Sequence, residues 1–271
     1  MNAPEKINQV CLPDVQAQKD TRSLAIQKAG VRGIKYPIFI ETDSRKYPSV
    51  GLFDMTVELD ASAKGTHMSR FIEVLEDNCN EISYEKVLHL SSAMLARLEA
   101  ETGYIKVTFP FFMEKLAPVS KVRGIMDYEV TYEVICKKNS PSIVQLEVVV
   151  PVTSLCPCSK NISDYGAHNQ RSHITVKASL KSSALKVEDI IKIAETSASC
   201  ELWSILKRPD EKFVTEKAFN NPKFVEDLVR DVAIKLQKLV NQNLISGFSV
   251  ESENFESIHN HSAFALIDHN I

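Results

Sequence analysis

A repeated order of secondary-structure patterns limits how this chain can fold. A strand pattern is followed by two helix patterns and then by strands, once between residues 51 and 153 and again between residues 173 and 251. Within the first occurrence, Val130, Tyr132 and Val134 alternate with polar residues, which is typical of a strand with one solvent-facing side. The order predicts an α+β fold in which helices cover one face of antiparallel sheets.

The individual elements follow from local patterns. Ser83 is the expected N-cap of one helix, Asn221 with Pro222 is expected to open another, and Gly247 should end that helical region. The predicted strands are Gly51–Leu59, Tyr104–Met113, Gly124–Cys136, Ile143–Thr153, His173–Leu180 and Phe248–Glu251, and the predicted helices are Phe71–Leu75, Tyr84–Leu98, Ile190–Leu206 and the one that opens at Asn221.

These elements divide the chain into three parts. We interpret residues 1–48 as an N-terminal arm with short ordered pieces, residues 49–160 as a first module, and residues 161–271 as a second module with a C-terminal tail. Each module would leave open sheet edges, which favours closure by oligomerisation.

Composition excludes several classes of protein. The 271 residues are 44% hydrophobic and 25% charged with a net charge of −3, which is ordinary for a globular chain and argues against a dedicated nucleic-acid binder. No apolar run is long enough for a membrane helix, and the N-terminus has no apolar signal-peptide core. We therefore expect a cytoplasmic protein whose six cysteines are mostly reduced.

The residues most able to bind a metal or take part in catalysis follow the strand that ends near Thr153. Cys156 and Cys158 come first, and His168 and His173 follow after a polar loop. Thiolate and imidazole are preferred ligands of borderline-soft divalent metals. Three interpretations remain open: a closed structural zinc site of all four residues, ordinary semi-buried cysteines with surface histidines, or an open catalytic metal site that uses one cysteine and one histidine.

Four further groups are candidates for a site. They are the C-terminal pair His259 and His261, the charged run from Leu206 to Lys212, the segment Gly65–Arg70 ahead of a helix, and Glu226. The purely structural alternative for Glu226 is an ion pair with Arg230 on the same helix.

Together these stretches closely resemble GTP cyclohydrolase type IB, an enzyme family of folate synthesis. The matching segments span almost the whole chain after residue 50, in order. They are Phe53-Asp54-Met55, Gly65-Thr66-His67-Met68-Ser69-Arg70, Ser154-Leu155-Cys156-Pro157-Cys158-Ser159-Lys160, Gly166-Ala167-His168-Asn169-Gln170-Arg171, Leu206-Lys207-Arg208-Pro209-Asp210-Glu211, Asn221-Pro222-Lys223-Phe224-Val225-Glu226-Asp227 and Glu256-Ser257-Ile258-His259.

The resemblance implies a bimodular tunnelling fold assembled into a barrel-like homotetramer. It also implies a metal site of Cys156, His168, Glu211 and His259, with Glu216 and His261 as close alternatives for the last two. Zinc or manganese is the expected metal, with iron or cobalt as alternatives. Glu226 maps to the glutamate that anchors the purine, and Cys158 has no assigned role.

The implied reaction is the hydrolysis of GTP at C8 by a metal-activated water, with release of formate and formation of 7,8-dihydroneopterin triphosphate, the first step of tetrahydrofolate synthesis. Besides Cys156, His67 or His173 would take part in catalysis by moving protons. The candidates for binding the triphosphate are Arg70, Arg123, Lys160, Arg171, Lys207 and Arg208. Two alternatives are an archaeal-type enzyme that stops at a cyclic phosphate, and a non-catalytic purine- or pterin-binding module with a structural zinc.

Overall fold

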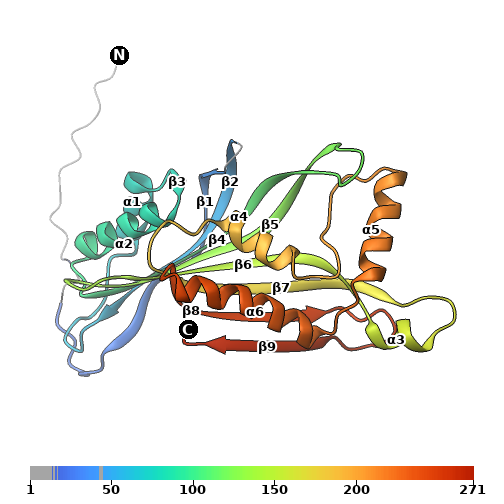
Figure 1. Ribbon diagram of the computed structural model, residues 1–271. Coiled ribbons are helices and arrows are strands. Elements are labelled where there is room, and N and C mark those ends of the chain that lie inside the picture. Colours follow the sequence, from blue (N-terminus) through green and yellow to red (C-terminus); the bar gives the residue numbers. More distant parts are fainter. Residues whose placement is uncertain (1–13, 15, 17, 43–44) are drawn as a thin grey trace, which may run out of the picture.

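The computed structural model describes residues 14, 16, 18–42 and 45–271. In this part of the chain the strands form one nine-stranded sheet in the order β3-β1-β2-β4-β5-β6-β7-β8-β9, so the two expected sheets are continuous (Figure 1). The strands are β1 (Ile26–Glu41), β2 (Lys46–Leu59), β3 (Glu81–Ile82), β4 (Thr102–Leu116), β5 (Arg123–Lys137), β6 (Ile143–Leu155), β7 (Asn169–Leu180), β8 (Ile245–Asn254) and β9 (Ala263–His269).

All strand pairs are antiparallel except β1 with β3. The helices are α1 (Met68–Asn78), α2 (Tyr84–Leu98), α3 (Pro157–Ile162), α4 (Val187–Glu195), α5 (Arg208–Asn220) and α6 (Val225–Asn241). None of the helices in the described ranges is both long and apolar enough to cross a membrane. The predicted α+β class is confirmed.

Helices α1, α2, α4 and α6 share one hydrophobic core with the sheet. Along β6, Val144, Leu146, Val148, Val150 and Val152 are all buried and belong to this core. The alternate side chains of the strands face the other side of the sheet, where Glu133 pairs with Lys106 and Lys177. The prediction of a sheet with helices on one face is therefore confirmed.

The predicted helix Tyr84–Leu98 coincides with α2. Its N-cap is Ser83, whose side-chain oxygen accepts a hydrogen bond from the backbone N–H of Lys86 at 3.3 Å. This bond satisfies one of the four N–H groups that an α-helix leaves without an internal partner.

Some expectations from the sequence were wrong in the N-terminal half. The interpretation of residues 1–48 as an arm fails for Ile26–Glu41, which form the long strand β1 against β2. A polar strand at the edge region of a sheet has few buried positions, so its alternation was weak: only Ile38 and Ile40 are buried. Residues 1–13 of the predicted arm lie outside the described residues.

The predicted helix Ile190–Leu206 was too long. Helix α4 ends at Glu195, and the following chain crosses to β6, where the backbones of Thr153 and Cys200 exchange two hydrogen bonds of 2.9 and 3.3 Å. Ser197 and Ala198 are small and buried, so they imitate a helical apolar stripe. They are in fact packed in a close approach of the loop to the sheet.

Helix α5 replaces the predicted charged connection. Its buried residues are only Asp210 and Ala218, and its Phe213 and Phe219 are exposed, so no buried apolar stripe revealed it. Asn221 ends α5 rather than opening α6, whose N-cap is Phe224. Gly247 lies within β8, and the expected C-terminal tail contains β9.

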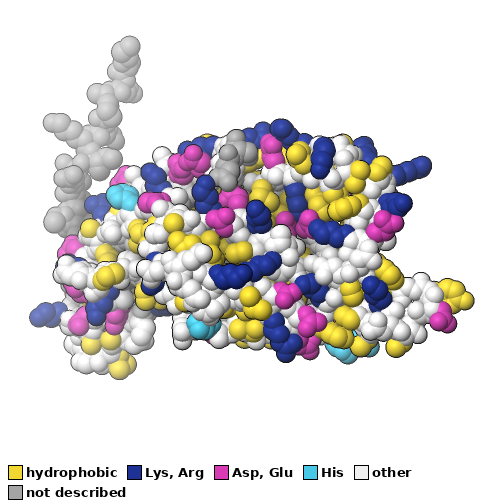
Figure 2. Space-filling view, in the orientation of Figure 1, with side chains coloured by type: hydrophobic (Ala, Val, Ile, Leu, Met, Phe, Trp, Pro, Cys, Tyr) yellow, Lys and Arg dark blue, Asp and Glu magenta, His cyan; other side chains and the backbone are white. Residues whose placement is uncertain are grey.

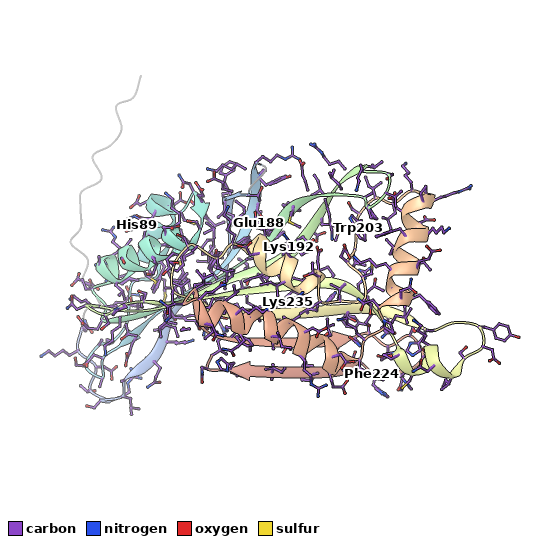
Figure 3. All side chains as sticks on the ribbon, viewed as in Figure 1. His89, Glu188, Lys192, Trp203, Phe224 and Lys235 are labelled. Atoms are coloured by element: carbon purple, nitrogen blue, oxygen red, sulfur yellow. The ribbon has the colours of Figure 1, made fainter. Side chains whose placement is uncertain are left out.

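Strands β5 and β6 separate at one end of the sheet. Their pairing runs from Ile135–Ile143 to Glu129–Val149, and beyond it β5 continues beside β4 while β6 continues beside β7. The loop from α4 to α5 enters this opening, and Figure 3 places its Trp203 between these two helices. Trp203 donates its indole N–H to the carbonyl of Leu116 at 3.0 Å.

A buried ion pair holds that loop in place. Lys115 Nζ lies 2.6 Å from Glu195 Oε1 and 2.8 Å from the carbonyl of Leu202, and the hydroxyl of Tyr128 donates to Glu195 at 2.9 Å. The side chains of Lys115 and Glu195 are 13% and 10% exposed. The network links β4, β5, α4 and the loop.

We predict that Lys115→Met lowers the free energy of unfolding by about 3–5 kcal/mol, because it leaves a buried carboxylate without its charge partner. Urea denaturation measures this. The control is Lys106→Met. The Lys106 side chain is 37% exposed and its Nζ lies 3.7 Å from Glu133, so this variant should lower the free energy of unfolding by less than about 1 kcal/mol. Equal costs for the two variants would contradict the prediction.

Candidate active site

The structure brings Cys156 and His168 together at the end of the β6–β7 pair. The last register pair is Leu155 with Asn169, and the next residues outward are the two candidates. The N–H of Cys156 donates to the carbonyl of His168 at 3.2 Å. Cys156 is also the N-cap of α3, and its Sγ accepts a hydrogen bond from the N–H of Ser159 at 3.4 Å. Backbone pairing thus holds Cys156 and His168 next to each other.

Burial separates Cys156 and Cys158 from the other cysteines of the described chain. Cys79, Cys136 and Cys200 are buried, and burial raises the pKa of each thiol, to about 11 for Cys79 and about 12 for Cys200. Such groups stay protonated at neutral pH and are poor metal ligands. Cys156 is partly exposed and Cys158 is exposed, so these two remain accessible.

The His168 ring is surrounded by polar groups from the chain that follows it. Its Nδ1 lies 3.0 Å from Gln170 Oε1, 3.4 Å from Ser257 Oγ and 3.9 Å from Glu256 Oε2. The segment that begins at Glu256 is one of those that match the family, but the sequence predicted no role for the Glu256 carboxylate. The register of β7 with β8, which brings Ser172 opposite Asn254, places it here.

Glu211 lies at the other end of α5 from this group. The neighbouring Asp210 carboxylate accepts hydrogen bonds from the N–H groups of Val119 and Ser120, both at 2.8 Å, in the β4–β5 turn. The last turn of α5 contacts α3, since Lys160 donates to the carbonyl of Phe219. Eight residues separate Glu211 from Phe219, a rise of about 12 Å along a helix.

The remaining predicted ligands are exposed. Glu216 pairs with Lys212 at 3.8 Å on the surface of α5. His259 and His261 lie in the loop before β9, with their rings stacked at a centroid distance of 5.1 Å. Across the described residues, no three His, Cys, Asp or Glu side chains are grouped closely enough to hold a metal ion. The four-ligand set therefore stays a prediction, and the closed zinc site is not assembled in the described chain either.

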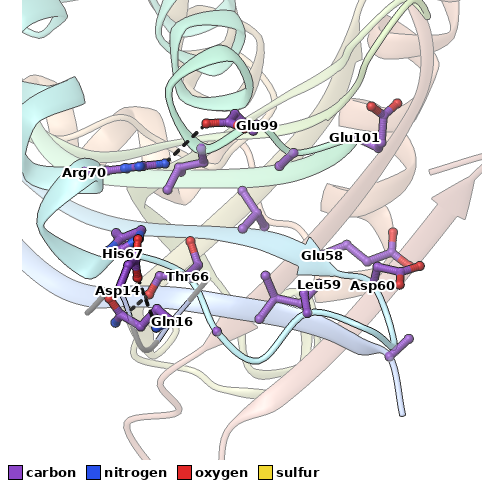
Figure 4. A pocket seen from close by; sticks show the side chains of 16 residues that line it. Asp14, Gln16, Glu58, Leu59, Asp60, Thr66, His67, Arg70, Glu99 and Glu101 are labelled. Carbon is purple, nitrogen blue, oxygen red and sulfur yellow. Dashed lines mark hydrogen bonds and ion pairs between the residues drawn. The ribbon is translucent and has the colours of Figure 1, made fainter. Parts of the chain in front are cut away.

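His67 and Arg70 line a separate cavity of about 520 Å³ beside α1 and β2 (Figure 4). His67 Nε2 lies 3.1 Å from an Asp14 carboxylate oxygen, and Arg70 lies 3.7 Å from Glu99. The sheet order places β4 and β5 between this cavity and the β6–β7 pair that holds Cys156.

Arg171 and His173 line another cavity, of about 580 Å³, where β5 and β6 separate. Both side chains lie on the sheet face opposite the helices, and the His173 ring meets the Phe255 ring edge-on at 4.9 Å. Burial, followed by the nearby Arg171 charge, lowers the pKa of His173 below its ordinary value. A neutral imidazole is the form able to accept a proton.

Glu226 lies in the first turn of α6, close in the chain to a contact with the Cys156 strand. The N–H of Lys223 donates to the carbonyl of Leu155 at 3.1 Å, and Figure 3 places Phe224 at the end of α6 that faces α3. Arg230 forms an ion pair with Asp227 at 3.7 Å, so the ion pair considered as the structural role of Glu226 is made by Asp227 instead. Glu226 itself is exposed.

The predicted phosphate-binding cations are spread over the chain. Arg123 pairs with Glu114 at 3.2 Å, Lys160 lies over the Phe219 ring, and Lys207 and Arg208 stand at the start of α5. Figure 2 shows Lys and Arg interspersed with Asp and Glu over the visible face.

Comparison with known proteins gives a consistent result. A family model described as type I GTP cyclohydrolase folE2 matches residues 12–265. GTP cyclohydrolase FolE2 of Burkholderia ambifaria is 54% identical over 95% of this chain and 94% of the relative. GTP cyclohydrolase FolE2 1 of Dechloromonas aromatica is 53% identical over 98% and 97%.

Solved structures share the fold at much lower identity. The uricase of Arthrobacter globiformis has a TM-score of 0.52 at 8% identity, over 89% of this chain and 93% of that one. The urate oxidase of Bacillus sp. TB-90 has a TM-score of 0.50 at 8% identity, over 90% and 99%. This likeness agrees with the tunnelling fold that the family resemblance implies.

We predict that His173→Gln makes stability less sensitive to acid. Because the folded-state pKa of His173 lies below 6.5, the unfolded chain binds the proton first, and stability is lost as the pH falls through and below that value. Melting temperatures at about pH 7.5 and about pH 5.5 should show a larger drop for the natural chain than for the variant. Parallel drops would contradict the prediction.

Proposed function

The chain belongs to the type I GTP cyclohydrolase folE2 family, and from this membership we propose that it hydrolyses GTP in tetrahydrofolate biosynthesis. The observation that supports the proposal most is the Cys156–His168 pair. These two residues belong to separate family motifs of the sequence. They become neighbours only when the chain folds and β6 pairs with β7.

We propose that Cys156 and His168 provide two ligands of a divalent metal ion. A thiol and an imidazole on adjacent strand ends fit zinc, and iron and cobalt accept the same donors, while an added carboxylate would suit manganese. The proposed remaining ligands are Glu211 and His259, with Glu216 and His261 as alternatives. When bound, the ion would supply Lewis acidity that lowers the pKa of a water molecule toward neutrality.

The other proposed roles belong to side chains of this chain. The Glu226 carboxylate would accept two hydrogen bonds from the N–H and NH₂ groups of the guanine edge and so fix which ring atom faces the metal ligands. His67 or His173 would exchange protons with the ring nitrogens of the substrate. Arg70, Arg123, Lys160, Arg171, Lys207 and Arg208 are the proposed cations for the triphosphate.

The proposed products are formate and 7,8-dihydroneopterin triphosphate. The alternatives are the cyclic phosphate of an archaeal-type enzyme and a purine- or pterin-binding module without turnover. Mass analysis of the product distinguishes the first alternative, because the cyclic phosphate has a lower mass.

We further propose that the site is completed by a second copy of the chain, as in a barrel-like homotetramer. Three observations support this. The cavity with His67 and Arg70 is separated from Cys156 by two strands of the same sheet, and Glu211 stands about two turns of helix from the end of α5 that contacts α3. The exposed strand β9 gives a second copy an edge to pair with.

We predict that a chelator abolishes formate release from GTP and that Zn²⁺ or Mn²⁺ restores it. Cys156→Ala should lower kcat on the order of 100-fold or more, because a metal ligand is lost. Cys158→Ala is the matched control two residues away, and it should retain activity within about threefold. Turnover of GTP by Cys156→Ala at the natural rate would favour the non-catalytic or non-metal alternatives.

We predict that two inactive variants complement each other when their residues come from different copies. Equal mixing of unfolded and co-refolded Cys156→Ala and Arg70→Ala chains should restore about one quarter of the natural activity, since one quarter of sites would receive both natural residues. Cys156→Ala mixed with His168→Ala should restore none, because both residues belong to one copy. Failure of the first mixture, with each protein folded, would reject the shared site.

A further inference from the structure

A buried chain of hydrogen-bonding side chains connects His168 to the interior of the protein. It lies on the helix-covered face of the sheet, across β6, β7 and β8. Gln170, Ser154, Ser172 and Asn254 are 8%, 2%, 0% and 3% exposed. Gln170 Nε2 lies 2.9 Å from Ser154 Oγ, Ser154 Oγ lies 2.8 Å from Ser172 Oγ, and Ser172 Oγ lies 2.7 Å from Asn254 Oδ1.

Glu256 determines which way the Gln170 amide points. An ionised carboxylate only accepts hydrogen bonds, and Glu256 Oε1 lies 3.4 Å from Gln170 Nε2. The NH₂ group must therefore face Glu256 and Ser154, and the amide oxygen must face His168. Because that oxygen is an acceptor, His168 Nδ1 is the donor across the 3.0 Å contact.

The serine hydroxyls complete a chain in which each proton has one direction. Ser154 Oγ accepts from the Gln170 NH₂ group, so the single proton of Ser154 can point to Ser172. The single proton of Ser172 then points to Asn254 Oδ1. Each step fixes the next, and a buried network that is satisfied in this way holds its members rigidly.

We propose that Gln170 is a positioning residue that keeps His168 in the tautomer with the proton on Nδ1, which leaves the Nε2 lone pair for a metal ion. The inference rests on the metal site of the proposed function. Ligating histidines commonly donate their other ring N–H to a fixed acceptor, which sets the tautomer and the ring orientation. Here the acceptor is the Gln170 amide oxygen, and Glu256 sets the direction in which that amide points.

The test is ¹⁵N NMR of the full-length, metal-free protein with labelled histidine at about pH 8, where an imidazole is neutral. The His168 resonances should show protonated Nδ1 and unprotonated Nε2. Gln170→Leu should remove that preference and weaken Zn²⁺ binding about 10–100-fold in a chelator competition. Ser172→Ala, which breaks the chain far from the ring, is the control for a general loss of stability and should retain the tautomer.

Glu256→Gln gives a second test that does not alter the core. It replaces the acceptor-only carboxylate, so the Gln170 amide is free to turn and the tautomer should become mixed. A proton on Nε2 in the natural protein would overturn the inference, and so would an unchanged tautomer in both Gln170→Leu and Glu256→Gln. If the tautomer depends on Gln170 but no metal binds, the inference stands and the proposed metal site fails. If metal binds equally well to the natural protein and to Gln170→Leu, the proposed metal site stands and the inference fails.

Discussion

The antiparallel pairing of β6 with β7 determines most of what this chain can do. It runs without a register shift from Val144–Leu180 to Leu155–Asn169. Side chains alternate between the two faces of a strand, so a slip of one residue would move the whole set to the opposite face. The buried valines of β6 would then meet solvent, and the interior would receive charged side chains such as Glu147. The apolar core thus fixes the register, and the register fixes the distance between Cys156 and His168.

The same register explains how polar groups come to lie in the core beside the site. On the helix-covered face, β6 changes from Val152 to Ser154, and β7 changes from Ile174 to Ser172 and Gln170. Strand β8 changes likewise from Val250 to Ser252 and Asn254. The changes are staggered by one register position from strand to strand, so Asn254 lies opposite Ser172 and Ser154 lies opposite Gln170, and these four side chains can pair with one another. Pairing offsets the free energy that burial of a lone amide or hydroxyl would cost.

The sequence was most informative where burial was strongest. Central strands and the amphipathic helix α2 have regular apolar periods, and they were predicted almost to the residue. Helix α5 was missed because tertiary contacts of Asp210 anchor its start in place of an apolar stripe. The end of α4 was misplaced because Ser197 and Ala198 are buried for a loop-to-sheet contact and not for a helix face. Periodicity reports burial, and it does not distinguish the element that is buried.

The candidate site shows the same division between what a chain pattern reveals and what only register reveals. Cys156 and His168 were assigned through the family resemblance, because thiol and imidazole side chains by type alone left open which cysteine and which histidine would bind a metal. Gln170 and Glu256 were not, since amides and carboxylates occur throughout the surface and become specific only when β7 and β8 bring them to the His168 ring. In the proposed site the two kinds of residue would play different parts: the first would contribute an atom to metal binding, and the second would decide which atom that is. A side chain of the second kind therefore has to be recognised from the acceptors and donors around it.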